Sequence, residues 1–177
     1  MFPLRFISEK GAEANLSFLL IGGHAVNFYA EPRATLDVDL VIRKGDALQW
    51  RRIVEGEGFK LFRDGGNFVQ FAPPYGVSWR LDFMLVNDST FQKLLQGSRE
   101  VDCLGIRARV PSPLHLIAMK LHALQHGPED RKDKDFMDVV GIARNALIDV
   151  DSPELKDVFT KHGSAEIYEK LKQRLGA

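Results

Sequence analysis

The sequence has almost no cysteine: Cys103 is the only one among 177 residues. A single thiol cannot form an internal disulfide, which excludes a disulfide-stabilised scaffold and predicts a reducing, cytoplasmic setting. Long apolar runs are missing too, because the longest, such as Phe18 to Ile21, have four residues. A membrane-spanning helix needs roughly 20, so we expect no membrane association.

Charge of one sign is not in excess either, since 24 Lys and Arg residues balance 24 Asp and Glu residues. Tight non-specific binding to nucleic acid depends on many cationic contacts with phosphates, and this composition argues against it. The first ten residues carry charges without a sustained apolar stretch, which predicts no signal peptide. The sequence contains no internal repeat and no linker, so we predict one domain over residues 1–177.

The residues that are present suit a globular core, with 45% hydrophobic and 27% charged side chains. Strand and helix patterns alternate up to about residue 110, and residues 111–177 have a helical pattern throughout. Ser112 is the expected cap of a helix over 113–126, and further helices are expected over 131–147, 153–161 and 165–175. We therefore predict an α+β fold, a mixed β-sheet flanked by helices, with a C-terminal helical bundle.

Two acidic residues lie on one predicted strand near the N-terminus. An apolar strand over 18–21 is followed by Gly22-Gly23 and by a helix from His24 to Tyr29, which Pro32 ends. In the next strand, over 36–42, the residues alternate. Leu36, Val38 and Leu40 fall on one face, and Asp37 and Asp39 fall on the other.

A third acid, Asp82, lies on a predicted strand over 78–86, on the face opposite Leu81 and Phe83. The remaining segments between these strands and residue 110 have simple patterns. We expect helices over 46–55 and 89–95, a hairpin of strands 59–63 and 67–71, and a strand pair over 100–103 and 106–110.

Aspartates at i and i+2 on a strand project from the same face, with α-carbons about 6 to 7 Å apart. That separation lets Asp37 and Asp39 share a divalent cation, and Mg²⁺ binds one or two protein carboxylates while keeping positions for phosphates. Asp82 is then a third ligand or a base for a hydroxyl proton. The alternative is that these aspartates form the solvent-exposed face of a strand. Aspartate is disfavoured in strands, however, and three aspartates on strands favour a metal site.

Gly22-Gly23 lacks the Gly-Lys-Ser/Thr of a P-loop and is not part of a G-x-G-x-x-G pattern. A diglycine between strand and helix permits a close approach of the backbone, where free N–H groups attract a phosphate. The alternative is an ordinary strand-to-helix turn.

Gly22-Gly23, a spacer of 13 residues and Asp37-Val38-Asp39 resemble the signature of the nucleotidyltransferase superfamily with the DNA polymerase beta fold. Asp82, within Arg80-Leu81-Asp82-Phe83, matches its third acid. More narrowly, the segment is similar to small bacterial nucleotidyltransferase-like proteins related to the AbiEii-type toxins. The resemblance covers about residues 19–143.

In that branch a downstream lysine and an Arg-x-Lys-Asp-like element complete the site, and Lys120 and Lys134-Asp135 are the matching positions. Lys120 also lies within an apolar helix stripe, where a lysine either extends its ammonium to solvent or holds an anion. Asp135 lies in the first turn of its helix, where the dipole alone favours an acid. Two departures stand out: Gly23 replaces the serine of many members, and the local order is Arg131-Lys132-Asp133-Lys134-Asp135.

The resemblance implies transfer of a nucleoside monophosphate from an NTP to a hydroxyl of RNA, including tRNA, of a protein or of a small molecule. Asp37, Asp39 and Asp82 would hold Mg²⁺ or Mn²⁺, with Asp82 alternatively acting as base. Gly22, Gly23, Arg33 and Lys120 would bind the nucleotide, and Asp135 would assist orientation. A catalytically silent nucleotide-binding module and a tRNA-modifying toxin with an antitoxin partner are the alternatives.

Three other features have simpler explanations. His122 and His126 have a spacing that can share zinc, but no glutamate as in H-E-x-x-H lies between them. Cys103 is expected to be a packed thiol. The cations of the last helix are expected to form a solvated face or to touch RNA: Lys170, Lys172 and Arg174.

Overall fold

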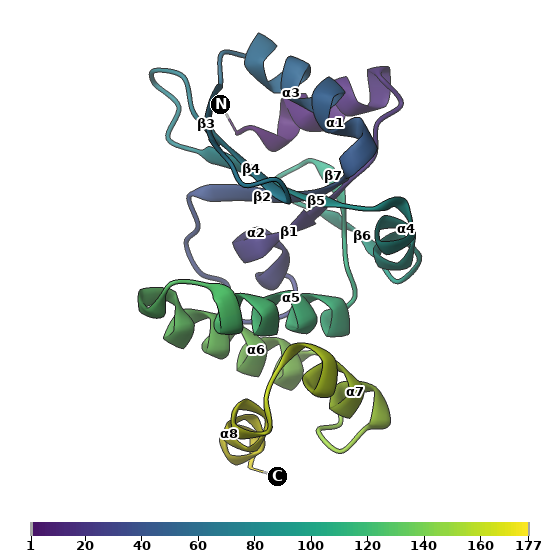
Figure 1. Ribbon diagram of the computed structural model, residues 1–177, viewed down its shortest axis with the longest axis vertical. Coiled ribbons are helices and arrows are strands. Elements are labelled where there is room, and N and C mark those ends of the chain that lie inside the picture. Colours follow the sequence, from purple (N-terminus) through teal and green to yellow (C-terminus); the bar gives the residue numbers. More distant parts are fainter. Residues whose placement is uncertain (1, 177) are drawn as a thin grey trace. The chain divides into compact units, whose positions relative to one another are not determined.

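The computed structural model describes residues 2–176 and is shown in Figure 1. These residues form eight α-helices and seven strands, and the predicted α+β class is confirmed. The chain divides into two compact units, Met1–Ala25 with Arg33–Pro111, and Val26–Pro32 with Ser112–Ala177. No helix in the described range is long and apolar enough to cross a membrane.

A five-stranded mixed sheet, in the order β1-β2-β5-β4-β3, forms the centre of the first unit. Only β2 and β5 run parallel, and the other neighbours are antiparallel. A separate antiparallel pair consists of β6 and β7. The strands are β1 (Phe18–Ile21), β2 (Asp37–Arg43), β3 (Lys60–Asp64), β4 (Phe68–Ala72), β5 (Arg80–Val86), β6 (Arg99–Asp102) and β7 (Arg107–Val110).

Helices α1 and α3 cover one face of this sheet (Figure 1). Trp50 of α3 is fully buried and packs edge-on against Phe83 of β5, with ring centroids 6.0 Å apart. On the other face, Arg43 of β2 places its guanidinium 4.2 Å from the ring centroid of Phe91 in α4. The helices that begin in this unit are α1 (Leu4–Glu13), α2 (Gly22–Val26), α3 (Ala47–Gly56) and α4 (Asp88–Gln96), with a 3-10 turn at Lys44–Asp46.

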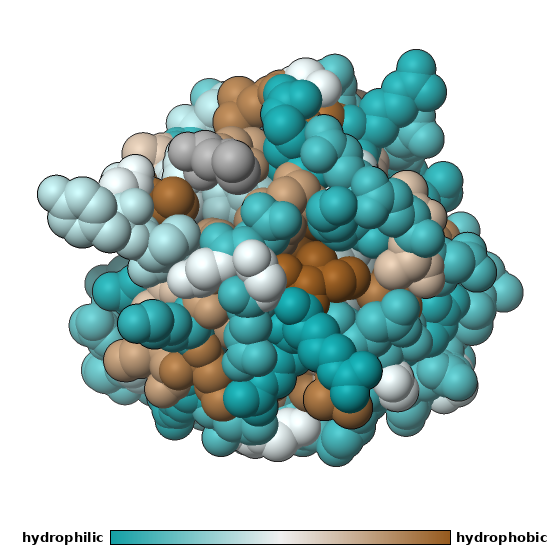
Figure 2. All heavy atoms as spheres, turned by 90° about the horizontal axis from the view of Figure 1, so that it is seen from above, coloured by the Kyte–Doolittle hydropathy of each residue, from teal (hydrophilic) through white to brown (hydrophobic). Residues whose placement is uncertain are grey.

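The outer surface over α1 and α3 is mostly hydrophilic, and apolar side chains appear there as small separate patches (Figure 2). Extended apolar patches are what mark interaction sites on soluble proteins. Among the described residues seen in this view, the apolar groups are too small and scattered to form such a patch.

The second unit is helical: α5 (Pro113–His126), α6 (Lys132–Asn145), α7 (Pro153–His162) and α8 (Ala165–Leu175), with a 3-10 turn at Glu129–Arg131. Three of these helices begin at a serine whose hydroxyl accepts a hydrogen bond from the backbone N–H three residues on. The caps are Ser112, Ser152 and Ser164. Such caps satisfy an N–H group that has no partner within the helix, which is why serine marks these starts in the sequence.

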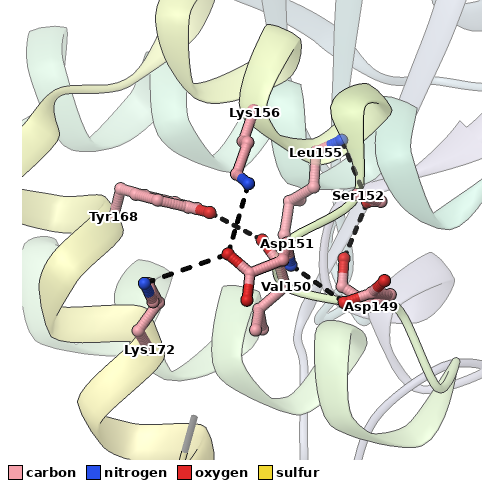
Figure 3. Close-up of polar contacts among 8 residues, drawn as sticks. All are labelled: Asp149, Val150, Asp151, Ser152, Leu155, Lys156, Tyr168 and Lys172. Carbon is pink, nitrogen blue, oxygen red and sulfur yellow. Dashed lines mark hydrogen bonds and ion pairs between the residues drawn. The ribbon is translucent and has the colours of Figure 1, made fainter.

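The loop between α6 and α7 is tied to α8 by polar contacts (Figure 3). The hydroxyl of Tyr168 donates to the carbonyl of Val150 at 2.7 Å. Asp151 lies 3.2 Å from the ammonium of Lys156 and 3.9 Å from that of Lys172. The C-terminal helix is thereby fixed against the rest of its unit.

Most predicted elements are confirmed with ends shifted by a few residues, and three expectations were wrong in detail. Helix α2 begins at Gly22 and ends at Val26, before Pro32 could end it. Leu36 precedes β2 and is 65% exposed, so it does not share the buried face of Val38. The helical pattern over 131–147 also predicts a buried Phe136, which is only half-buried. Helix α1 was not predicted, because no side chain caps it after Pro3.

Candidate active site

The candidate site of the first unit lies on one row of residues across the sheet. Asp39 of β2 is the direct partner of Ile21 on β1 and of Asp82 on β5. Paired residues on adjacent strands point to the same face, with strands roughly 4.8 Å apart. Asp37 follows the same face two residues earlier. The period-two pattern thus predicted correctly that the acids share one face, and all three are half-buried.

Gln70 of β4 extends this row, because it is the direct partner of Asp82. Its side-chain amide donates to Asp82 Oδ2 at 2.7 Å. A neutral amide therefore orients the third carboxylate toward β4. Gln70 was missed from the sequence, although its place between buried Val69 and Phe71 assigns it to the face opposite these two.

The diglycine turn packs directly against the acid strand. Gly22 has φ +60, a left-handed conformation that side chains rarely adopt, and a β-carbon there would collide with the carboxylate of Asp39. Glycine at this position thus brings the backbone against the acid. This contact explains physically why the diglycine and the Asp-x-Asp pair occur together.

Gly23 is enclosed by the segment that precedes β2. A β-carbon at Gly23 would lie 2.7 Å from Oγ1 of Thr35 and 3.3 Å from Nη1 of Arg33. The structure therefore places Arg33, a predicted nucleotide ligand, beside the diglycine. Thr35 was given no role from the sequence.

His24 follows the diglycine and is 8% exposed. Its ring lies 5.3 Å from that of Phe2 and 5.5 Å from that of Trp79, and its Nε2 has no hydrogen-bond partner among the described residues. Burial lowers the pKa of this imidazole below its ordinary 6.5, because an apolar environment disfavours the charged form. This environment thus favours the uncharged form of the ring that follows the diglycine.

The other predicted residues lie in the second unit. Lys120 of α5 places its ammonium 2.7 Å from Asp135 Oδ1 and 2.7 Å from Asp138 Oδ2, both on α6. Asp135 is 4% exposed and Asp138 is 5% exposed. The sequence left two environments open for Lys120, an ammonium in solvent or one that holds an anion. The structure shows that the ammonium holds anions, which are the carboxylates of Asp135 and Asp138. Asp138 was missed, although residues three apart on a helix share a face.

The donor set of β2 suits a hard divalent cation. Among residues 2–176, no group of three or more His, Cys, Asp or Glu side chains is arranged to hold a metal ion. Mg²⁺ usually binds only one or two protein carboxylates and keeps its other positions for water and phosphate. Asp37 and Asp39 alone therefore fit it.

Competing features carry no chemistry here. The rings of His122 and His126 lie 4.4 Å apart, but no third ligand joins them within residues 2–176. Cys103 is buried as expected, and burial together with nearby Asp102 raises its thiol pKa. In α8, Lys170 pairs with Glu166 at 2.7 Å, which accounts for its charge.

An open groove of about 660 Å³ lies within the second unit, away from the predicted residues of α5. Most of its lining residues are polar or charged, and both signs of charge are present. Lys132 lies 2.6 Å from Glu129, and Lys170 is paired as above, so these cations are neutralised locally. We assign no chemistry to this groove.

No protein-family model and no curated protein matches the chain, but several solved structures are similar to it. An antigenic nucleotidyltransferase-like protein from Paracoccidioides brasiliensis is 17% identical, with a TM-score of 0.58 over 97% of this chain and 89% of that one. ANT(2'')-Ia in complex with adenylyl-2''-tobramycin is 16% identical, with a TM-score of 0.64 over 97% and 95%. The lincomycin-bound lincosamide antibiotic adenylyltransferase LnuA is 14% identical, with a TM-score of 0.55 over 78% and 95%.

At these identities the likeness establishes the fold alone. The nucleotidyltransferase-like fold that the sequence resemblance implied is confirmed. The narrower relation to AbiEii-type toxins stays a prediction.

Proposed function

We propose that this protein transfers a nucleoside monophosphate from an NTP to a hydroxyl group, with release of pyrophosphate. One observation carries the proposal: a row across the sheet joins Asp39 and Asp82, and the diglycine packs against Asp39 at its end. Carboxylates that suit a cation thus lie next to a backbone turn that suits phosphates. The shared fold supports the same chemistry.

In the proposed reaction the acceptor oxygen forms a bond to the α-phosphorus, and the bond from that phosphorus to the oxygen bridging it to the β-phosphorus breaks. Asp37 and Asp39 would hold Mg²⁺ or Mn²⁺, which offsets phosphate charge when bound. Asp82 takes the hydroxyl proton or completes the metal site. In the first role, the amide of Gln70 would hold Oδ2 of Asp82 in place while the carboxylate takes the proton.

Nucleotide binding is proposed for Gly22, Gly23 and Arg33 on the phosphates. Lys120 is proposed to contact the triphosphate as well. An ammonium group has three N–H donors, and its two short contacts to Asp135 and Asp138 leave one for a phosphate oxygen. Asp135 then orients Lys120 and has no direct contact with the nucleotide.

Label transfer tests this function. Purified protein is incubated with Mg²⁺, each α-phosphate-labelled NTP and separate RNA, protein and metabolite fractions. Asp37→Ala/Asp39→Ala is the disabled variant. Glu100→Ala/Asp102→Ala is its matched control, because these acids have the same spacing on β6. Label in one fraction with wild type and control, absent with the disabled variant, supports the function and identifies the acceptor class.

If no fraction became labelled, the proposed transfer of a nucleoside monophosphate would be wrong. If NTP then still raised the melting temperature, the protein would be a silent nucleotide-binding module. That alternative is favoured by Gly23, which supplies no side-chain hydroxyl to the phosphates.

The same assay can compare classes of acceptor. One fold neighbour is in complex with adenylyl-2''-tobramycin, and another is bound to lincomycin. An aminoglycoside and a lincosamide therefore belong among the metabolites tested. A tRNA-modifying toxin with an antitoxin partner predicts growth arrest on expression that disappears with Asp39→Ala. Normal growth with the wild-type protein would exclude the toxin.

A further inference from the structure

Position 23 requires a glycine because of the nearby side chain of Thr35, and its backbone conformation does not require one. Gly22 needs a positive φ, but Gly23 does not, so any residue could adopt its backbone conformation. A β-carbon at Gly23 would lie 2.7 Å from Oγ1 and 2.9 Å from Cβ of Thr35. Real β-carbons do not approach other atoms this closely, so the side chain of Thr35 already occupies the space beside the turn.

The hydroxyl of Thr35 is only weakly engaged. Its hydrogen bond to the carbonyl of Asp37 spans 3.4 Å, beyond the usual range for a strong hydroxyl bond. Thr35 is half-buried, so part of the residue remains open to solvent. A hydroxyl carries one donor that rotates to suit its partner. Arg33 Nη1 lies beside the same glycine, which adds a fixed positive charge.

We propose that Thr35 is a phosphate-binding residue of this site, whose hydroxyl donates to a non-bridging oxygen of the nucleotide triphosphate. The proposal rests on the function proposed above. Thr35 supplies from the segment before β2 the hydroxyl that the diglycine turn does not carry, and Arg33 supplies charge beside it. A glycine at position 23 is what gives Thr35 this place.

Removal of the hydroxyl without a change of shape is the direct test. Calorimetric titration measures the affinity for ATP, GTP, CTP and UTP with Mg²⁺, and for inorganic tripolyphosphate with Mg²⁺. Thr35→Val is nearly isosteric and should bind about tenfold more weakly, the usual effect of one hydrogen bond to a charged group. Thr35→Ser should bind like the wild type. The matched control is Thr160→Val in α7, whose hydroxyl bonds only to the carbonyl of Lys156.

Thermal melting separates binding from packing. If Thr35 binds phosphate, Thr35→Val keeps the melting temperature of the wild type and loses affinity. If Thr35→Val binds as tightly as the wild type, the proposal is overturned. It is equally overturned if Thr35→Ser and Thr35→Val lose the same affinity together with melting temperature, because Thr35 then only fills space.

A second pair of variants transfers the hydroxyl from residue 35 to residue 23. Gly23→Ser alone should lower the melting temperature, because its side chain collides with Thr35. In Gly23→Ser/Thr35→Gly the collision is removed; alanine would not suffice, since Cβ of Thr35 itself lies 2.9 Å away. This double variant should bind about tenfold more tightly than Thr35→Gly alone. Equal affinity of the two would count against the proposal.

The wild type distinguishes the two levels of failure. If it binds neither an NTP nor tripolyphosphate, the proposed function fails, and the role of Thr35 fails with it. If the wild type binds and Thr35→Val binds equally well, only the role of Thr35 fails.

Discussion

The two units hold their carboxylates in opposite ways. On the sheet, Asp82 is half-buried and accepts a hydrogen bond from the neutral amide of Gln70. In the helical unit, Asp135 and Asp138 are almost fully buried and share the ammonium of Lys120. A buried charge needs an opposite charge, whereas a half-exposed carboxylate can keep capacity for a cation or a proton. The comparison indicates that the helical cluster of Lys120, Asp135 and Asp138 stabilises its unit, in addition to the nucleotide contact proposed for Lys120. The strand acids keep the partial exposure that their proposed chemistry needs.

Removal of Lys120 should have the largest effect on stability. Lys120→Met leaves two buried carboxylates uncompensated and should lower the free energy of unfolding by about 3–5 kcal/mol. Lys132→Met is the matched control: Lys132 pairs with exposed Glu129, and loss of a surface pair costs about 0–1 kcal/mol. Chemical denaturation of both variants measures the difference. Equal small losses would show that the helical cluster is no more structural than a surface pair.

A β-carbon at the diglycine should have the next largest effect. Gly22→Ala introduces backbone strain and a collision with Asp39, and should cost about 1–3 kcal/mol. Gly66→Ala isolates the strain, since Gly66 also has a positive φ, +79, but nothing lies within 4 Å of its β-carbon position. Denaturation should show a greater loss for Gly22→Ala. Equal losses would mean that the carboxylate of Asp39 moves aside freely.

The sequence predicts local features of this molecule well and contacts between elements poorly. Alternation placed Asp37 and Asp39 on one face, and the Ser112-Pro113 pair marked the start of α5, which the structure confirms. Gln70 contacts Asp82 on the neighbouring strand, and Asp138 contacts Lys120 on another helix. The spacing of residues along one element predicts neither strand register nor helix packing. These two residues were therefore missed.

Loss of the Gln70 amide should have a smaller effect than either change above. Gln70→Leu removes a charge-assisted hydrogen bond to half-buried Asp82 and should cost about 1–2 kcal/mol. Gln125→Leu is the matched control, because its amide donates over the same 2.7 Å but to the neutral, exposed carbonyl of Gly163. Denaturation of the two variants compares a charged with a neutral acceptor. If Gln125→Leu costs as much, the contact of Gln70 with Asp82 is no stronger than an ordinary amide bond.

The smallest expected effect is a pH dependence at His24, which is buried beside uncharged Phe2 and Trp79. Because burial lowers its pKa in the folded state, the unfolded chain binds more protons than the folded chain just below pH 6.5. Stability therefore rises with pH through this range. The contribution of neutral His24 to stability is fully present above pH 6.5 and declines as the pH falls toward the folded-state pKa.

Denaturation of the wild type and of His24→Phe between pH 5 and pH 8 measures this contribution. His115 and His122 also have pKa values lowered by burial, so both proteins should lose stability in acid. The wild type should lose more, because only it must protonate a ring beside the diglycine. Parallel curves would mean that His24 reaches solvent when protonated. The row of strand acids would then adjoin a ring that can leave its apolar site, unlike the carboxylates that Lys120 holds in the helical unit.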